Sequence, residues 1–464
     1  MRIGVRLGTR EVHAALLHGA RLAGAASAPH AAPSGPRAAG LEAATLEAAG
    51  RVLRGTAATA PSTITSVTWD ISAPLEAALT APAAGAPSGT VPRARPVAAL
   101  RLVPRPPAVP AAGAHPAGLI RSLVAWRGTA PGGHDLFGTE LAPPGVDAAL
   151  RCAEAVIAAG LTTVAVTATG ATARADHEVA VAAALLERFP ELRLCLSHET
   201  GGLGLLEREA TTVINAALLD PADTLISGCE QLTAALPGRP ACWFATGDGG
   251  RVSGRRLCWL PVLGLAATPA TALAAAARLA GTADALVVLV EGERVAAGQV
   301  REGLPHVESD LPGVAGVRTA APQPVLTTAP ARTAGTTLLA ARTRHTADVI
   351  AALDAPGLRV AEEIVRLSRS ATVLLRPEAD LAATGAAGTE PSAWLDLLVP
   401  VGAAESLEEV QAQAEQRALG LVAAHGAEPG SARIVRSSAT PVGYLRIYRL
   451  QVRAGSGRCV ESAA

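Results

Sequence analysis

Three short stretches carry the polar side chains with which this sequence could bind or transform a small molecule. His198 and Glu199 follow the predicted strand 192–197, and binding residues often collect at strand ends in α/β folds. Glu207 and Arg208 lie at the start of a predicted helix, and Asp248 lies in a Gly-Asp-Gly-Gly loop. We interpret His198, Glu199, Glu207, Arg208 and Asp248 as a candidate substrate pocket, and the sequence alone leaves their catalytic roles unknown.

Each of these residues also has a structural interpretation. His198 can bond a backbone carbonyl, as buried polar groups generally do. Glu207 and Arg208 can form a buried ion pair that orients the loop. Asp248 fits a plain turn, because Asp and Gly are common turn residues. Both interpretations stay open at this stage.

Other patterns argue against several enzyme classes. His134-Asp135 lies in a Gly-rich loop without a nearby Ser or Cys pattern, so a hydrolase triad is not expected. His177-Glu178 lacks a second His at the helical spacing of a zinc protease. All forty basic residues are Arg, which excludes a P-loop lysine and a Schiff-base lysine. We expect no metal ligands.

The overall charge and the cysteines restrict partners and location. Forty basic residues balance forty acidic ones, so general affinity for nucleic acid or an anionic membrane is not expected. The six cysteines form no C-x-x-C pair and suit core thiols in a reducing compartment. The start MRIGVRLG does not resemble a signal peptide. We therefore predict a cytoplasmic protein with no nucleic-acid and no membrane partner.

Strands and helices that would position these residues alternate along the chain, which predicts an α/β fold. A β-meander is expected first, and a hairpin turning at Glu291–Glu293 later. The predicted strands are 3–8, 11–17, 21–26, 63–69, 161–169, 192–197, 432–436 and 446–453, and the predicted helices are 39–53, 147–159, 176–189, 205–219 and 407–424.

The length of 464 residues favours two domains rather than one core. We place the boundary between residues 1–190 and residues 191–464. Residues 81–118 are rich in Pro and Ala, which predicts a surface segment with little regular structure.

The segment SHETGGLGLLEREATTVINAALLD (197–220) resembles the signature of the hydantoinase/oxoprolinase family. Matching residues include Ser197-His198-Glu199, Glu207-Arg208-Glu209 and Asn215-Ala216. GGHDLFGTELAPPG (132–145) and DHEVAVAAALLERFP (176–190) also resemble the family, in the same order. The resemblance implies two ribonuclease-H-like domains, as in actin-like ATPases, that face a cleft. In active relatives, ATP hydrolysis with Mg²⁺ drives opening of a five-membered cyclic amide such as a hydantoin or 5-oxoproline.

Against this family pattern, the nucleotide loops are degenerate. The first hairpin should read Asp-x-Gly-Gly-Thr, but Arg6 stands at the metal carboxylate and Leu7 at a glycine, with Gly8, Thr9 and Glu11 following. The second hairpin should fall in 284–298, where Gly-Gly-Thr is missing. The Ser-Gly-Pro loop becomes Ala267-Thr268-Pro269, the Gly-Thr-Thr loop becomes Val67-Thr68-Trp69-Asp70, and the adenosine loop corresponds at best to 327–335.

Two hypotheses follow. The chain is a divergent hydrolase of cyclic amides that has lost its dependence on ATP and needs no cofactor. Alternatively, it is a non-catalytic homologue that serves as an interaction or regulatory subunit. Its expected partner is a second hydantoinase-type subunit or another copy of the same chain.

Overall fold

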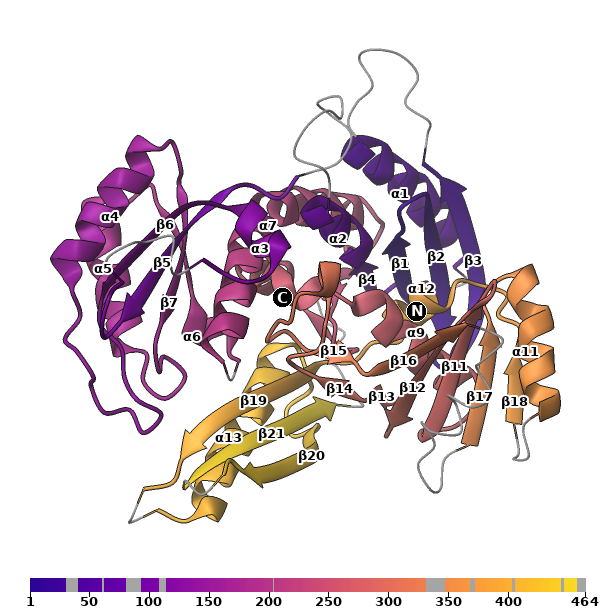
Figure 1. The fold of residues 1–464 in the computed structure, drawn as a ribbon. Coiled ribbons are helices and arrows are strands. Elements are labelled where there is room, and N and C mark those ends of the chain that lie inside the picture. The colour runs from indigo at the N-terminus through magenta and orange to yellow at the C-terminus, as the bar shows by residue number, and fades with distance from the viewer. Residues whose placement is uncertain are drawn as a thin grey trace.

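The computed structural model describes residues 1–30, 41–60, 62–80, 93–107, 114–202, 204–330, 347–367, 372–402, 405–443 and 446–456. Helices and strands alternate through these residues in a mixed α/β fold with several parallel sheets (Figure 1), which confirms the α/β part of the predicted fold class. Within these ranges, no helix is both long enough and apolar enough to cross a lipid bilayer.

The first sheet has the strand order β10-β9-β4-β1-β2-β3. Strands β1, β2 and β3 form the predicted antiparallel meander, and β4 and β9 continue the sheet in parallel with β1. Because β9 and β10 follow residue 190, this sheet takes strands from both sides of the expected domain boundary, which stays a prediction. The elements are β1 (Arg2–Leu7), β2 (Glu11–His18), β3 (Arg21–Pro29), α1 (Leu41–Ala58), β4 (Ser66–Asp70), α2 (Ser72–Thr80), β9 (Ala241–Ala245) and β10 (Arg251–Val252).

The second sheet is wholly parallel, with the order β6-β5-β7-β8. Helices α4 and α5 cover one side, and the long helix α7 lies on the other, between this sheet and the first (Figure 1). The elements are β5 (Val97–Val103), α3 (Gly118–Leu123), β6 (Val124–Pro131), α4 (Val146–Ala158), β7 (Thr163–Ala168), α5 (Asp176–Arg188), β8 (Arg193–Leu196), α6 (Ser197–Thr200) and α7 (Leu205–Ala234).

Strand β5 corrects the prediction for residues 81–118. Val97–Val103 is a central strand with parallel neighbours on both sides, and Leu100 and Leu102 belong to the core. The prolines on either side flank the strand without entering it, so no ladder hydrogen bond is lost. Residues 81–92 and 108–113 of this segment lie outside the described residues.

Helix α7 is longer than predicted, because it continues through Pro221 to Ala234. A proline inside a helix cannot donate to the carbonyl four residues earlier, which here belongs to Ala217. The backbone N–H of Arg95 donates to that carbonyl at 3.0 Å instead. The orphaned acceptor is thus satisfied from another segment.

The third sheet repeats the pattern of the first. Its order is β13-β12-β11-β17-β18, with β16 beside β12; β12 is antiparallel to β11 and to β16, whereas β17 and β18 continue in parallel. Alternate side chains of β11 belong to two different cores, as expected for a strand covered on both faces. The elements are α8 (Gly254–Trp259), η2 (Pro261–Gly264), α9 (Ala267–Leu279), β11 (Ala285–Glu291), β12 (Arg294–Arg301), β13 (Leu304–Pro305), β14 (Val307–Glu308), η3 (Val314–Gly316), β15 (Gln323–Pro324), β16 (Leu326–Pro330), β17 (Ala347–Ala352), α11 (Ala355–Leu367), β18 (Thr372–Leu375) and α12 (Leu381–Ala387).

A three-stranded antiparallel sheet, β19-β21-β20, ends the described chain, and α13 packs against it (Figure 1). Ser406 and Glu409 form a capping box at the start of α13, which matches the predicted start of this helix. The elements are β19 (Ser392–Pro400), α13 (Leu407–Ala424), β20 (Ala432–Pro441) and β21 (Ile447–Ser456).

Candidate functional site

A cavity of about 160 Å³ lies where the loops after β8 and β9 meet helix α13 and strand β19. Three of the five predicted pocket residues line it, namely His198, Glu199 and Asp248. Glu207 and Arg208 lie on the first turn of α7 and are not part of the lining. The fold therefore brings together residues that are distant in sequence, from the segments after β8 and β9 and from the C-terminal sheet.

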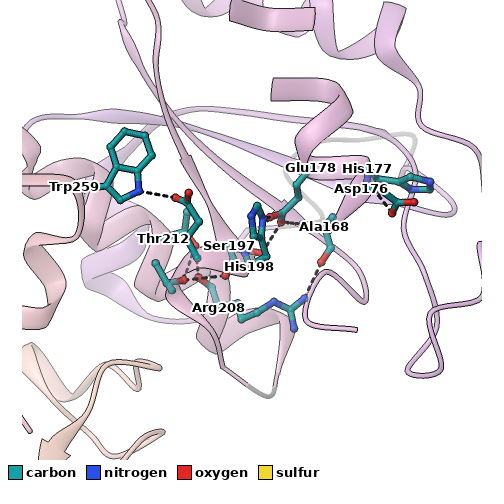
Figure 2. Close-up of polar contacts among 11 residues, drawn as sticks. Ala168, Asp176, His177, Glu178, Ser197, His198, Arg208, Thr212 and Trp259 are labelled. Carbon is teal, nitrogen blue, oxygen red and sulfur yellow. Dashed lines mark hydrogen bonds and ion pairs between the residues drawn. The ribbon is translucent and has the colours of Figure 1, made fainter. Parts of the chain in front are cut away.

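His198 is oriented by the buried carboxylate of Glu178 on α5 (Figure 2). Glu178 accepts hydrogen bonds from Nδ1 of His198 at 2.7 Å, the His198 backbone N–H, the Ser197 hydroxyl and the Ala168 backbone N–H. An ionised carboxylate only accepts, so the ring proton of His198 resides on Nδ1. The hydrogen bond to Glu178 raises the pKa of His198, against the lowering effect of burial. Within the described residues, no hydrogen bond involves Nε2 of this ring.

Glu199 forms the next part of the cavity wall. Its carboxylate accepts a hydrogen bond from the indole Nε1 of Trp259 at 3.1 Å. Burial raises the pKa of Glu199, and the neighbouring His198 opposes that rise. The side chain is thus held at the cavity by Trp259, which is itself about half exposed.

Asp248 occupies a turn, yet its carboxylate also reaches the C-terminal sheet. It accepts hydrogen bonds from the Thr246 hydroxyl at 2.5 Å, the Gly250 backbone N–H at 3.1 Å and the Ser392 hydroxyl at 2.6 Å. Buried Arg453 donates to the backbone carbonyl of Asp248, and burial lowers the pKa of Arg453 to about 10. Asp248 therefore joins β9 to β19 as well as lining the cavity.

Arg208 anchors the first turn of α7 to the end of β7. Its Nη2 donates to the Ala168 carbonyl at 2.7 Å (Figure 2). Burial lowers the pKa of Arg208, while the nearby carboxylates of Glu178 and Glu207 raise it. The Arg208 contact favours the architectural interpretation for this residue.

Among the described residues, one group has the composition of a metal site: His134, Asp176 and His177, with ligand-type atoms within 4.8 Å of one another. The Gly133 N–H donates to Nδ1 of His177, which places the proton of the neutral ring on Nε2, facing Glu140 at 3.3 Å. His134 similarly faces Asp176 through Nε2 at 3.1 Å. These histidines connect the loop before α4 to the start of α5, and they do not line the cavity.

Strands β1 and β4 and helix α9, which carry the expected nucleotide loops at 6–11, 67–70 and 267–269, lie on the opposite side of α7 from α5, where the histidine group begins (Figure 1). Residues 331–335 of the expected adenosine loop lie outside the described residues. Arg6 at the end of β1 donates to Asp380 through Nε at 3.0 Å and Nη2 at 2.7 Å. Gly8 and Glu11 close a tight turn through a 3.0 Å backbone hydrogen bond, with the side chains of Thr9 and Glu11 exposed. The position expected for a metal carboxylate thus holds a cation that is paired within the protein.

Thr268 belongs to a second closed network. Its hydroxyl donates to Oδ2 of Asp70 at 2.6 Å, and the backbone N–H and hydroxyl of Ser72 donate to Oδ1 of the same carboxylate. Burial raises the pKa of Asp70, and these hydrogen bonds oppose the rise. The network links the end of β4 to the start of α9 without leaving a free carboxylate oxygen at that position.

Sequence reasoning missed several polar residues around the cavity. Glu178 bears on the zinc-protease motif in the sequence, and its place on the first turn of α5 is the signal that could identify it as a partner for His198. Arg256, Arg417 and His425 also line the cavity. They come from α8 and from α13 and its end, and no local motif marks them.

No protein-family model matches this chain, and no curated protein matches it. Solved structures do, and two of them are enzymes. The ATP-dependent caprolactamase from Pseudomonas jessenii aligns with a TM-score of 0.71 at 13% identity, over 98% of this chain and 87% of the caprolactamase chain. Acetone carboxylase, from a nucleotide-free structure concerned with ATP-dependent acetone carboxylation, aligns with a TM-score of 0.61 at 10% identity, again over 98% and 87%. The chain therefore shares, over nearly its whole length, the fold of these two enzymes.

Proposed function

We propose that this chain is a divergent member of the hydantoinase/oxoprolinase family that hydrolyses a small cyclic amide in the cavity beside His198, without ATP. The observation that carries the proposal is the His198–Glu178 pair at the cavity wall. The caprolactamase, which shares the fold, is named for a lactam, and that agrees with a cyclic-amide substrate.

The same proposal includes two ribonuclease-H-like units that face a cleft. Its support is the repeated strand order. Three antiparallel strands are followed by two parallel strands both in β3-β2-β1-β4-β9 and in β16-β12-β11-β17-β18. The same strand order, with antiparallel and parallel pairings at the same places, is expected of two related structural units.

His198 suits the role of general base. With its proton on Nδ1, the neutral ring has a lone pair on Nε2 that can take a proton from water. The water oxygen then bonds to the amide carbonyl carbon, the carbon–nitrogen bond of the ring breaks, and the proton passes to the departing nitrogen. Glu178 is a positioning residue in this scheme, because it fixes the tautomer and stabilises the imidazolium.

The residues at the expected nucleotide loops do not fit Mg·ATP. Mg²⁺ prefers oxygen ligands, and the guanidinium of Arg6 cannot supply one. The two polar networks around Asp380 and Asp70 are satisfied within the protein. We therefore assign no step of the reaction to nucleotide.

Ring opening of hydantoin and 5-oxoproline, followed by chromatography without nucleotide, tests this function. We expect turnover by the wild-type chain and a loss of at least a hundredfold in His198→Asn, within the range typical of general bases. His306→Asn is a matched control, because His306 also pairs with a glutamate but lies outside this cavity. Equal activity in wild type and His198→Asn would refute the role of His198.

A non-catalytic subunit is the second candidate, and one surface feature favours it. Leu136, Phe137 and Leu141, on the loop between β6 and α4, are 43%, 49% and 51% exposed. Apolar side chains that gather on one loop often mark contact surfaces. Light scattering on the purified chain, alone and with a second hydantoinase-type subunit, should show an assembly that Phe137→Ser weakens. A monomer in both samples would argue against this candidate.

A further inference from the structure

Two arginines line the cavity without a hydrogen-bond or ion-pair partner among the described residues. Arg256 comes from α8 and Arg417 from α13. Among the residues that the structure describes, neither guanidinium forms a hydrogen bond or a salt bridge. Arginine side chains at a cavity wall usually pair with a carboxylate or phosphate, because their planar fork matches both groups.

The two guanidinium groups also repel each other. Arg417 lowers the pKa of Arg256 through its charge, in addition to the larger effect of burial, and Arg417 acts in the same direction on His198. Positive charge is therefore concentrated on one side of the cavity. Bringing like charges together is unfavourable unless an anion lies between them.

The acidic residues of the cavity do not cancel this charge. Asp396 is held by Arg449 in a two-point ion pair, and Asp248 is occupied by three hydrogen-bond donors. Glu199 is the remaining acidic residue of the cavity lining, and its charge acts on Arg256. Its carboxylate is already hydrogen-bonded to Trp259. One carboxylate thus stands against two guanidinium groups.

Given the proposed role of the cavity as a substrate site, on which this step depends, we propose that Arg256 and Arg417 bind an oxyanion of the substrate, a carboxylate or a phosphate. The anionic group bridges the two guanidinium groups and directs the rest of the molecule towards His198 and His425. His425 is suited to accept a hydrogen bond there. Its Nδ1 lies 2.8 Å from the backbone carbonyl of Ser392, a partner that can only accept, so its proton resides on Nδ1 and its lone pair on Nε2.

Calorimetric titration with matched ligands tests the subsite directly. 5-Oxoproline carries a carboxylate on the ring that 2-pyrrolidinone carries without one, and succinate and inorganic phosphate supply the anion without any cyclic amide. We expect 5-oxoproline to bind and 2-pyrrolidinone to bind at least tenfold more weakly. Arg256→Met and Arg417→Met should each weaken anion binding by about tenfold or more. The exposed neighbour Arg255→Met, which is outside the lining, should not.

The outcomes separate this inference from the proposed reaction. Arginine-dependent binding of succinate without turnover of any cyclic amide supports the anion subsite and contradicts the hydrolase. If inorganic phosphate binds in an arginine-dependent way and succinate does not, the oxyanion of the substrate is assigned to a phosphate ester. Turnover of cyclic amides that is unaffected by both arginine substitutions, or no anion binding at all, overturns the subsite.

Discussion

The guanidinium of Arg6 and the carboxylate of Asp380 form a two-point ion pair between the first sheet and helix α12. Asp380 also caps α12, because its Oδ1 accepts a hydrogen bond from the Ala383 backbone N–H at 2.8 Å. One carboxylate therefore serves both the helix start and the cation at the end of β1. The residue at the position where the family pattern expects a metal carboxylate therefore takes part in the contact between β1 and α12.

We expect that millimolar Mg·ATP is not hydrolysed and does not raise the melting temperature. A ligand at about a hundred times its Kd would stabilise the folded state by roughly 2.7 kcal/mol, which differential scanning fluorimetry detects readily. Arg6→Asp should not restore turnover, because Thr268 and Asp70 remain occupied by each other. A thermal shift with Mg·ATP, or ATP-dependent turnover by Arg6→Asp, would show that the nucleotide site persists.

Removing Arg6 should destabilise the fold more than removing an exposed arginine. Arg6→Met leaves Asp380, whose side chain is only 18% exposed, without its cation. We expect a loss of about 1–3 kcal/mol in the free energy of unfolding, between the values for exposed and buried pairs. The control Arg51→Met breaks an exposed pair with Glu47 and should cost less than about 1 kcal/mol. Urea denaturation measures the free energy of unfolding of both variants. Equal losses would contradict the claim that the Arg6–Asp380 pair stabilises the fold more than an exposed pair does.

The raised pKa of His198 gives a signed pH dependence. A histidine whose folded pKa exceeds its unfolded value of about 6.5 stabilises the fold fully below that pH, and the contribution is lost as pH rises through the folded pKa. In NMR titration, the His198 ring should therefore change protonation above pH 6.5. In Glu178→Gln the midpoint should fall, because the largest cause of the rise is removed while the effect of burial remains. An unchanged midpoint would exclude Glu178 as the positioning residue.

The sequence predicted elements best where local pattern and environment agree. The hairpin of β11 and β12 is predictable because a continuous run of apolar residues, as a strand covered on both faces requires, leads into a short polar turn. Strand β5 was missed because flanking prolines dominate its composition, although only its buried residues pair in the sheet. Helix α7 was predicted to end early because the rescue of the Ala217 carbonyl by Arg95 depends on tertiary contact.

The residues of the cavity could likewise be predicted from the sequence only where they are close together along the chain. His198 and Glu199 could be found because they share one strand end. Arg256 and Arg417 come from separate helices, and no spacing in the sequence indicates that their charges converge. The pairing of Arg6 with Asp380 likewise depends on how α12 packs against β1. The sequence pattern of β1 does not predict that packing.

Docking of α12 on β1 requires a glycine at position 4, which gives a sharp test of the fold. A Cβ at Gly4 would lie 2.0 Å from the Ala383 carbonyl oxygen and 2.3 Å from the Ala387 nitrogen, both backbone atoms. Because backbone cannot move aside as a flexible side chain can, Gly4→Ala forces α12 away from the sheet. We expect a loss of about 2–4 kcal/mol, comparable with or above other cases of overpacking.

Gly55→Ala is the matched control, because Gly55 lies in α1 with no atom within 4 Å of an added Cβ. There the same change should stabilise the protein by about 0.5–1 kcal/mol, since alanine is the better helix former. Urea denaturation of the two variants beside the wild type separates the outcomes by sign. If Gly4→Ala were as stable as Gly55→Ala, helix α12 would not rest on β1 as described, and the Arg6–Asp380 pair that depends on this docking would be wrong as well.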